Sequence, residues 1–254
     1  MEDRSRVSRL VRLLQLASPA LPIGSYSYST GLETAIDRGR VRDAGAAFDW
    51  IADAVTLVLA RFDAPLLAAA LDAGVAGDRA RLADLNRQAL AARETAELRL
   101  ECEQAGYSLA RWIEQVACPL QHDHDDLQPR PGDTASKDDS LRAGAIADLS
   151  ASIGRPLAAP VGWALACASV GLPARDAVTA FLWSFAENQA AVLLKAMPLG
   201  QAGAQRLLLR LGPVVAAAVD AALALSPSSW SNAAPGLAIA SMRHETQYSR
   251  LFRS

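Results

Sequence analysis

The segment His244-Glu245-Thr246-Gln247-Tyr248 comes closest to a catalytic motif in this sequence. A zinc hydrolase of the His-Glu-x-x-His type needs a second histidine four residues after the first, because side chains at that spacing share one face of a helix and hold the metal together. Tyr248 occupies that position here, so one metal ligand is absent. The pattern favours polar contacts at a helix end or a partner surface, and a metal-dependent hydrolase that uses His244 and Glu245 is the alternative.

A second group of potential metal ligands is the run His122-Asp123-His124-Asp125-Asp126. Imidazole and carboxylate groups suit a borderline divalent ion. The run lies in residues 119–142, a polar, acidic and proline-containing stretch whose composition predicts a flexible loop rather than a linker between domains. Adjacent ligands in such a loop are not preorganised, so we assign no metal site to the chain. Capture of nickel by this loop is an open alternative.

Motifs for other enzyme chemistry are absent from the sequence. There is no Gly-x-x-x-x-Gly-Lys-Ser/Thr phosphate-binding loop, no Gly-x-Gly-x-x-Gly and no Gly-x-Ser-x-Gly. The chain has only 3 histidines, and two of them belong to the acidic stretch, so a Ser-His or Cys-His pair is hard to form. We therefore predict a non-enzymatic protein without a cofactor.

Polar side chains interrupt one strongly apolar helical stretch. Glu187, Asn188 and Gln189 lie among large apolar residues, and Lys195 follows two helical turns after Glu187 on nearly the same face. Buried polar groups without hydrogen bonds cost about 1–3 kcal/mol each. Either these residues form a polar network that fixes helix packing, or they line a groove or water-filled channel.

The last residues of the chain are rich in the side chain types that dominate protein interfaces. Tyr, Phe and Arg are enriched at binding hot spots, whereas chain ends without a partner usually fray. We therefore predict a C-terminal tail over residues 227–254 that docks on a partner, although it could also fold back on its own core. Tyr26 and Tyr28, near the N-terminus, suit either role as well. The tail candidates are Arg243, His244, Glu245, Tyr248, Arg250, Leu251, Phe252 and Arg253.

Composition indicates that helices must position these residues. Hydrophobic residues make up 51% of the 254 residues, much of this fraction is alanine, and aromatics reach only 6%. Alanine, leucine and arginine are strong helix formers, so we predict an all-α fold. The net charge of −2 gives no field for nucleic acid.

The cysteines and the absence of targeting signals predict a cytoplasmic protein. The 3 cysteines are an odd number without paired spacing, which is typical of a reducing compartment. The N-terminal apolar stretch is broken by Arg12 and Gln15, so it does not resemble a secretory signal. No apolar run reaches the ~18 residues of a membrane helix without charges or prolines, and we expect no membrane contact.

Apolar spacing predicts one globular helical domain over residues 1–226, followed by the tail. Pro19 and Gly39 are expected helix stops, and Pro65 is expected to begin a helix. The stretch 78–117 has the clearest helical periodicity, and helical patterning resumes by Leu141 after the acidic loop. The expected helical stretches cover residues 7–17, 31–37, 43–73, 78–117, 161–170, 174–197 and 201–225.

Four segments together resemble the UreF-type urease accessory proteins. They follow one another in the family's order and span most of the chain. The acidic stretch departs from the family pattern by its length, so no family role is assigned to it. The four segments are residues 14–33, residues 93–101 with Gly106, residues 184–201 and residues 239–254.

The resemblance implies a UreF-like helical bundle that assists the maturation of urease by nickel insertion. It further implies a homodimer that binds a UreD/UreH-type accessory protein, recruits or regulates a UreG-type GTPase and delivers nickel to apo-urease. Family proposals also include an internal water-filled path for the nickel ion. Under this resemblance Glu187, Asn188, Gln189 and Lys195 become candidates for a channel or for control of the GTPase.

Overall fold

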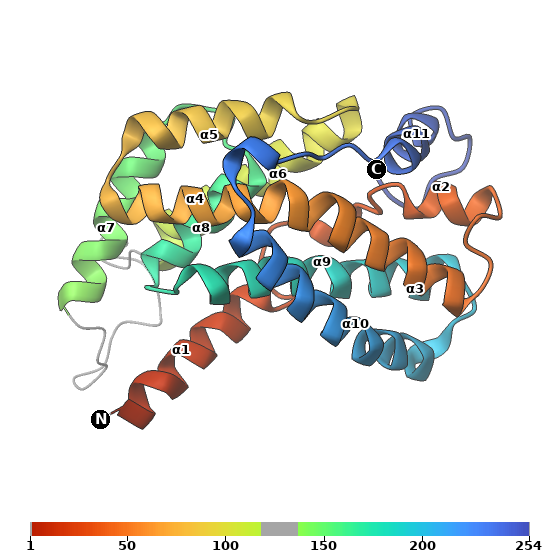
Figure 1. Cartoon of the computed structure of the whole chain (residues 1–254), viewed down its shortest axis with the longest axis horizontal. Coiled ribbons are helices and arrows are strands. Elements are labelled where there is room, and N and C mark those ends of the chain that lie inside the picture. The colour runs from red at the N-terminus through yellow and green to blue at the C-terminus, as the bar shows by residue number, and fades with distance from the viewer. Residues whose placement is uncertain (1, 118–136, 254) are drawn as a thin grey trace.

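Helices form all the regular structure in the part of the chain that the computed structural model describes, residues 2–117 and 137–253. Figure 1 shows their arrangement as a single bundle. The α-helices are α1 (Glu2–Ala17), α2 (Leu32–Asp37), α3 (Ala44–Asp53), α4 (Asp63–Ala76), α5 (Arg79–Ala91), α6 (Ala96–Trp112), α7 (Lys137–Ser152), α8 (Ala159–Ser169), α9 (Ala174–Ala196), α10 (Gly200–Ala224) and α11 (Pro235–His244). Single turns of 3-10 helix lie at Ser25–Ser27, Leu59–Arg61 and Pro227–Ser229, and wider π-type turns at Ala54–Val58 and Ile113–Ala117.

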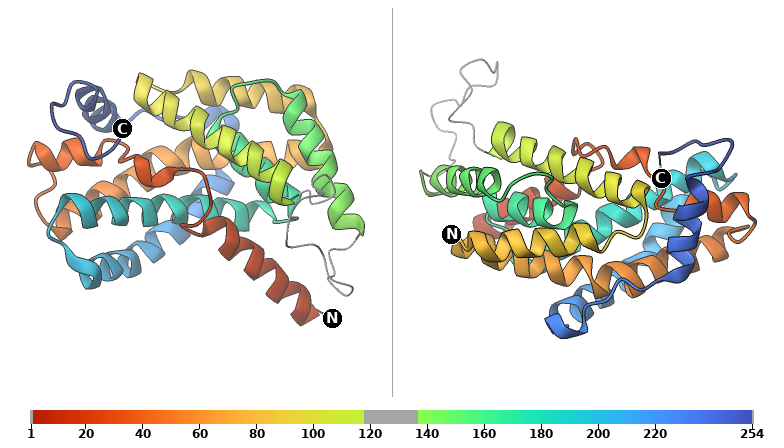
Figure 2. Two further views of the ribbon diagram at one scale, coloured as in Figure 1. Left: turned by 180° about the vertical axis from the view of Figure 1, so that it is seen from behind. Right: turned by 90° about the horizontal axis from the view of Figure 1, so that it is seen from above.

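The centre of the bundle is built from α4, α8 and α9. Helix α8 is apolar all round, and every residue from Pro160 to Ser169 is buried, as expected for a helix enclosed by others. It packs between α4 and α6, while α9 packs against α4 on one side and α10 on another. Helix α1 projects from this body, and α11 lies at the opposite end beside α2, as Figures 1 and 2 show. The prediction of one all-α domain is confirmed.

Two predicted helical boundaries differ from the structure. The stretch 78–117 is two helices, because Thr95 leaves the helical conformation and its hydroxyl accepts the Leu98 N–H, which begins α6. The predicted limit of the acidic loop at residue 142 is wrong, because α7 begins at Lys137. Its first turn holds Asp138 and Asp139, and negative charge is favourable at a helix N-terminus. Residues 119–136 of the expected loop, with His122 and His124, lie outside the described residues.

The tail contains regular structure that the sequence did not predict. After α10 the chain crosses the bundle, where Ser231 N–H donates to the carbonyl of Arg61. Pro235 then begins α11, a position that suits proline because the first helical N–H has no partner within the helix. Of the residues expected to dock on a partner, Arg243 and His244 lie in this helix, which packs on α2, and the other tail candidates follow it directly.

Two helical stretches are long and apolar enough to cross a membrane by length and composition alone. The first, Ala44–Ala76, is mostly buried and is interrupted by the turns between α3 and α4. The second is α10, which contains Pro213 and packs one face on α9. Core helices of soluble proteins pass the same test, so neither stretch indicates a membrane protein.

Candidate partner-binding site at the C-terminal tail

His244 joins the tail to two distant parts of the chain. It lies in the last turn of α11 and is 0% exposed. Its Nδ1 atom is 2.7 Å from Glu97 Oε2, and its Nε2 atom is 3.1 Å from Glu33 Oε2. The two carboxylates lie in the first turns of α6 and α2, where the helix dipole stabilises negative charge. We call Glu33, Glu97 and His244 the tail clamp.

The tail clamp uses both nitrogens of the imidazole ring. Nδ1 faces Glu97 and Nε2 faces Glu33, so each ring nitrogen already has a hydrogen-bond partner from its own chain. Among the described residues there is also no group of three His, Cys, Asp or Glu side chains placed to hold a metal. The geometry therefore gives no support to the alternative of a metal-dependent hydrolase built on His244 and Glu245.

The same two carboxylates also hold the residues after α11. Glu33 Oε1 accepts the Leu251 N–H at 2.7 Å, and Glu33 Oε2 accepts the Phe252 N–H at 3.1 Å. Arg250 Nη1 donates to Glu97 Oε1 at 2.8 Å. The end of the chain thus returns to α2 and α6 and is fixed through its backbone as well as its side chains.

A second set of hydrogen bonds fixes α11 against the start of α6. The hydroxyl of Ser241 lies 2.7 Å from that of Thr95, and Glu245 accepts the Ala96 N–H at 3.1 Å. On the other side, a side chain at Gly31 would come within 3.3 Å of the Ala240 Cβ. Gly31 also has φ of 80°, which glycine adopts without strain. The close approach of α2 to α11 therefore depends on this glycine.

The tail and tyrosine candidates fall into buried and exposed groups. His244 is buried in the tail clamp, and Phe252 is buried, with the ammonium group of Lys195 lying 5.1 Å from its ring centre. Tyr28 is buried too, and its hydroxyl donates to Gln104. These three side chains contact their own chain, so the expectation of partner contact now concerns the others. Arg243, Glu245, Tyr248, Arg250, Leu251, Arg253 and Tyr26 are exposed.

Of the four polar candidates on α9, Asn188 lines a cavity that opens to the surface. The cavity of about 130 Å³ lies between α6, α8, α9 and the segment before α2, and Asn188 lines it. Asn188 Nδ2 donates to the Tyr28 carbonyl at 2.9 Å, while its Oδ1 atom and both polar atoms of Gln189 have no hydrogen-bond partner in the described part of the chain. Burial raises the pKa of Glu187, against a hydrogen bond from Trp183 that lowers it.

The cavity wall also contains a buried ion pair and a thiol. Arg93 is paired with the fully buried Asp63. Burial raises the pKa of Cys102, although the charge of Arg93 acts in the opposite direction, so the side chain stays a thiol. Its sulfur accepts the Ala159 N–H at 3.3 Å. A neutral, hydrogen-bonded thiol is a packing group and not a metal ligand.

Sequence reasoning missed Glu33, Glu97 and Thr95 as parts of this site. Each is polar and stands at the beginning of a helix, where it reads as an ordinary capping or first-turn residue. The available signal was their position inside two of the four segments that carry the family resemblance. The structure brings those segments together with the tail at His244.

Comparison with known proteins shows the family of this chain. The sequence model of the UreF family matches residues 41–212. The chain belongs to the UreF family. It is 49% identical to the urease accessory protein UreF of Azoarcus sp. (strain BH72) over 245 residues, which cover 96% of this chain and 95% of the relative.

Further relatives show the same extent of similarity. The chain is 48% identical over 242 residues to the urease accessory protein UreF of Ectopseudomonas mendocina (strain ymp), covering 95% of this chain and 97% of the relative. It is 43% identical over 249 residues to that of Cupriavidus metallidurans, covering 97% of this chain and 98% of the relative. These UreF relatives thus match both the bundle and the C-terminal tail.

Proposed function

We propose that this member of the UreF family is a non-enzymatic assembly factor for the maturation of urease by nickel insertion in the cytoplasm. It binds a UreD/UreH-type accessory protein through the C-terminal tail. It also recruits or regulates a UreG-type GTPase and helps to deliver nickel to apo-urease. The names of the relatives support urease maturation. The observation that carries the role of the tail is that Tyr248 and Leu251 are exposed on a segment held in place by the tail clamp.

This arrangement resembles a preorganised binding surface. An unanchored C-terminal segment would have to be ordered at the moment of binding, which weakens the interaction. Here Glu33 and Glu97 fix the backbone and the arginine of the tail before any partner arrives. Large exposed side chains such as Tyr248 can then contribute their contact area at a small entropic cost.

Tyr248 and Leu251 provide the test of tail docking. We expect the double substitution Tyr248→Ala/Leu251→Ala to weaken binding to the UreD/UreH-type protein at least about tenfold, because hot-spot residues cost more than about 1 kcal/mol each. The melting temperature should stay unchanged, since both side chains are exposed. Biolayer interferometry with the full-length chain measures the affinity.

Two other exposed apolar residues provide a matched control. Val75 and Leu209 are more than two-thirds exposed and lie on α4 and α10, away from the tail. The variant Val75→Ala/Leu209→Ala should bind like the wild type. If the tail variant also binds like the wild type, the tail is not the docking surface.

The polar residues of α9 are assigned to a water-filled path or to control of the GTPase. Asn188 borders the cavity with an unpartnered carbonyl oxygen, which a water molecule or a hydrated ion could use. Lys195, two turns after Glu187, touches Phe252 and so connects α9 with the tail. Glu187 and Gln189 lie in the same stretch of α9, and we propose the same role for them, in a water-filled path or in control of the GTPase.

Helix α1 supports the proposal of a homodimer because its apolar side chains face solvent, whereas two of its arginines face the body of the protein. Arg9 pairs with Asp176 at 3.1 Å, and Arg12 pairs with Asp139 at 3.0 Å. These contacts turn the arginines toward the body of the protein. The side chains of Val7, Leu10, Val11 and Leu14, each more than half exposed, form an apolar stripe at helical spacing on the outside.

A second copy of the chain fits this stripe. Beside it, a groove of about 410 Å³ contains Leu14, Trp183 and Glu187. Two α1 helices packed antiparallel about a twofold axis would place Val7 of each copy against Leu14 of the other.

Disruption of the stripe should produce a monomer. We expect Val11→Glu/Leu14→Glu to shift the mass in solution from dimer to monomer, because both charges would be buried at the apolar contact. Size-exclusion chromatography with light scattering measures the mass, and Leu209→Glu on α10 is the control. A dimeric Val11→Glu/Leu14→Glu variant would exclude α1 as the interface.

A further inference from the structure

The segment between α1 and α2 forms part of the wall of the cavity described above. Ser25 and Thr30 of this segment line the cavity, together with Cys102 of α6 and Asn188 of α9. We call residues 24–30 the cover loop. The width of the cavity on this side depends on where the cover loop lies.

The cover loop ends in a strained backbone conformation. Thr30 has φ of 51°, a region that β-branched residues rarely occupy because their side chain crowds the backbone there. Strain of this kind persists only where surrounding contacts hold the residue. The Thr30 hydroxyl provides one such contact, since it donates to Glu101 Oε1 at 3.2 Å. Loss of contacts around the cover loop would therefore favour its movement.

Three parts of the chain hold the cover loop in place. Helix α9 contributes Asn188, whose Nδ2 atom donates to the Tyr28 carbonyl at 2.9 Å. Helix α6 contributes Gln104, which accepts the Tyr28 hydroxyl. The third part is the end of the tail, because the Arg253 N–H donates to the Ser27 carbonyl at 2.7 Å. The first two contacts belong to helices of the bundle, whereas the tail can leave its place without the unfolding of a helix.

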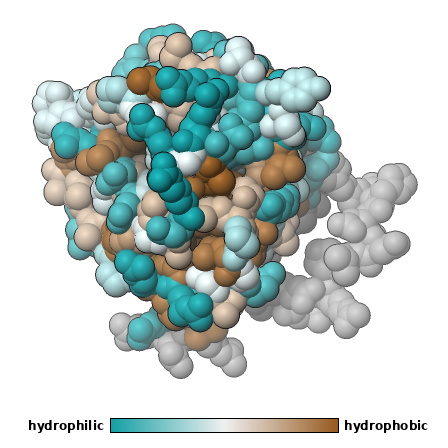
Figure 3. Space-filling view, turned by 90° about the vertical axis from the view of Figure 1, so that its right-hand side faces the viewer, coloured by the Kyte–Doolittle hydropathy of each residue, from teal (hydrophilic) through white to brown (hydrophobic). Residues whose placement is uncertain are grey.

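The tail reaches the cover loop at the surface of the molecule. Figure 2 shows the C-terminus beside the chain that leads into α2. Figure 3 looks onto the end of the molecule that α2 and α11 form, where hydrophilic and apolar side chains are mixed. The buried Phe252 anchors this part of the tail, and Arg253 follows it directly. The position of the last residues is therefore linked to the position of the cover loop.

We propose that the C-terminal tail controls how widely the cavity opens to solvent, because it holds the cover loop against α6 and α9. When the tail leaves its place, the cover loop loses the Arg253 N–H, and the strain at Thr30 is released as the loop moves. The cavity wall around Cys102 then becomes accessible to small solutes. This coupling is a property of the chain alone, so it does not rest on the proposed function.

The thiol of Cys102 reports on the opening of the cavity. It lines the wall and is 5% exposed, and burial raises its pKa, so it should react slowly with N-ethylmaleimide while the cover loop is in place. Its rate of modification then follows the fraction of molecules in which the loop has moved. Cys167 on α8 is 0% exposed and does not line the cavity, so it reports on opening of the whole bundle.

Two substitutions loosen the tail in different ways. Arg253→Pro removes the backbone donor to Ser27, and His244→Ala removes the ring at the centre of the tail clamp. In the full-length chain we expect each to increase the rate of Cys102 modification at least about fivefold, because the loss of one hydrogen bond changes a population by about that factor. The rate at Cys167 should stay unchanged. Mass spectrometry of tryptic peptides measures each thiol separately.

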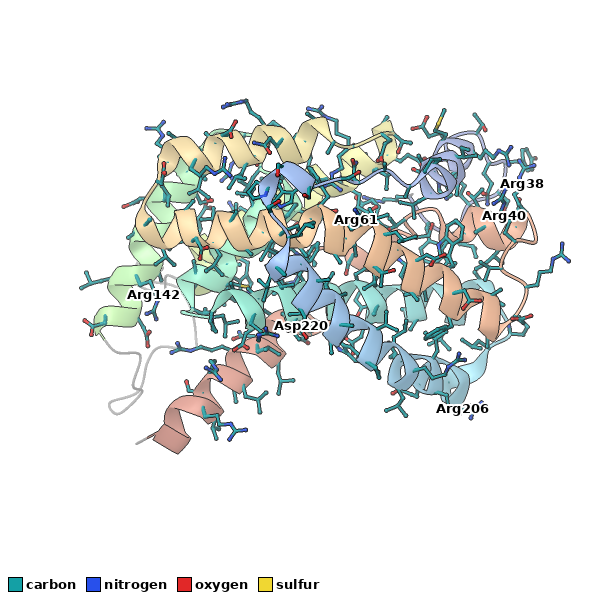
Figure 4. All side chains as sticks on the ribbon, viewed as in Figure 1. Arg38, Arg40, Arg61, Arg142, Arg206 and Asp220 are labelled. Atoms are coloured by element: carbon teal, nitrogen blue, oxygen red, sulfur yellow. The ribbon has the colours of Figure 1, made fainter. Side chains whose placement is uncertain are left out.

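Another exposed arginine provides the matched control. Arg206 lies on α10, on a different part of the molecule, as Figure 4 shows, and in Arg206→Ala both thiols should react as in the wild type. Equal acceleration at Cys102 and Cys167 in the tail variants would mean that the whole bundle opens, which overturns the proposal. No acceleration at Cys102 in either tail variant, or the same acceleration in the control, overturns it as well.

Discussion

His244→Ala is expected to release the tail from the body of the protein. The substitution leaves Glu33 and Glu97, whose side chains are only 7% and 13% exposed, without the imidazole ring between them. Removal of one partner from a buried hydrogen bond leaves the other group unsatisfied, which costs about 1–3 kcal/mol and more where that group is charged. The cost falls on contacts that hold α11 and residues 250–252, so local opening should precede global unfolding.

Limited trypsin digestion and hydrogen exchange measure this release. Cleavage after Arg243 and Arg250 should become much faster in the variant, whereas exchange in α8 should change little, because that helix is enclosed by others. Binding to the UreD/UreH-type protein should fall as well, since the docking residues would lose their support. Leu209→Ala is the control, because this side chain is 77% exposed on α10 and lies away from the tail.

A second substitution distinguishes an unpaired charge from a simple loss of packing. In the His244→Ala background, Glu33→Gln removes one of the isolated charges but keeps an oxygen that accepts the Leu251 N–H. We expect this double variant to be more resistant to trypsin than His244→Ala alone. If Glu33→Gln makes the tail still less resistant, the electrostatic account of the tail clamp is wrong.

The bundle was predictable because its signals are local. Helical periodicity and proline or glycine stops depend on residues within a few turns of one another. The break at Thr95 was missed because the apolar spacing of α5 continues into α6, and only the capping hydroxyl separates them. Helix α11 was missed because proline and polar residues precede it. Its position depends mostly on contacts with α2 and α6.

The tail clamp could not be predicted from spacing. Glu33, Glu97 and His244 are separated by long stretches of chain, and each has an ordinary local interpretation. His244 attracted attention as part of an incomplete zinc motif, but its two contacts are carboxylates from distant helices. Buried polar networks of this kind depend on tertiary structure, and only the family resemblance indicated that the three segments belong together.

The contact between α6 and α8 should be the least tolerant point of the fold. Gly106 is buried in α6 and faces the chain just before α8. A Cβ atom at this position would collide with the Leu157 carbonyl oxygen and would lie 2.6 Å from the Leu157 carbonyl carbon and 2.9 Å from that of Ala158. Backbone atoms cannot rotate away as a flexible side chain can, so one helix must move. Gly162 on α8 faces the same contact, only 3.1 Å from Leu109 Cβ.

We therefore expect Gly106→Ala to destabilise the protein by about 3 kcal/mol or more, at the upper end of overpacking effects. Alanine has a higher helix propensity than glycine by about 1 kcal/mol, so helix propensity alone would make the variant more stable. A loss of stability therefore reports the collision with the backbone before α8. Gly212→Ala is the matched control, because it lies within α10 with no atom near the added methyl group and should be neutral or stabilising. Urea denaturation followed by circular dichroism measures both variants. Equal stability of the two would mean that α6 and α8 are not in backbone contact at Gly106.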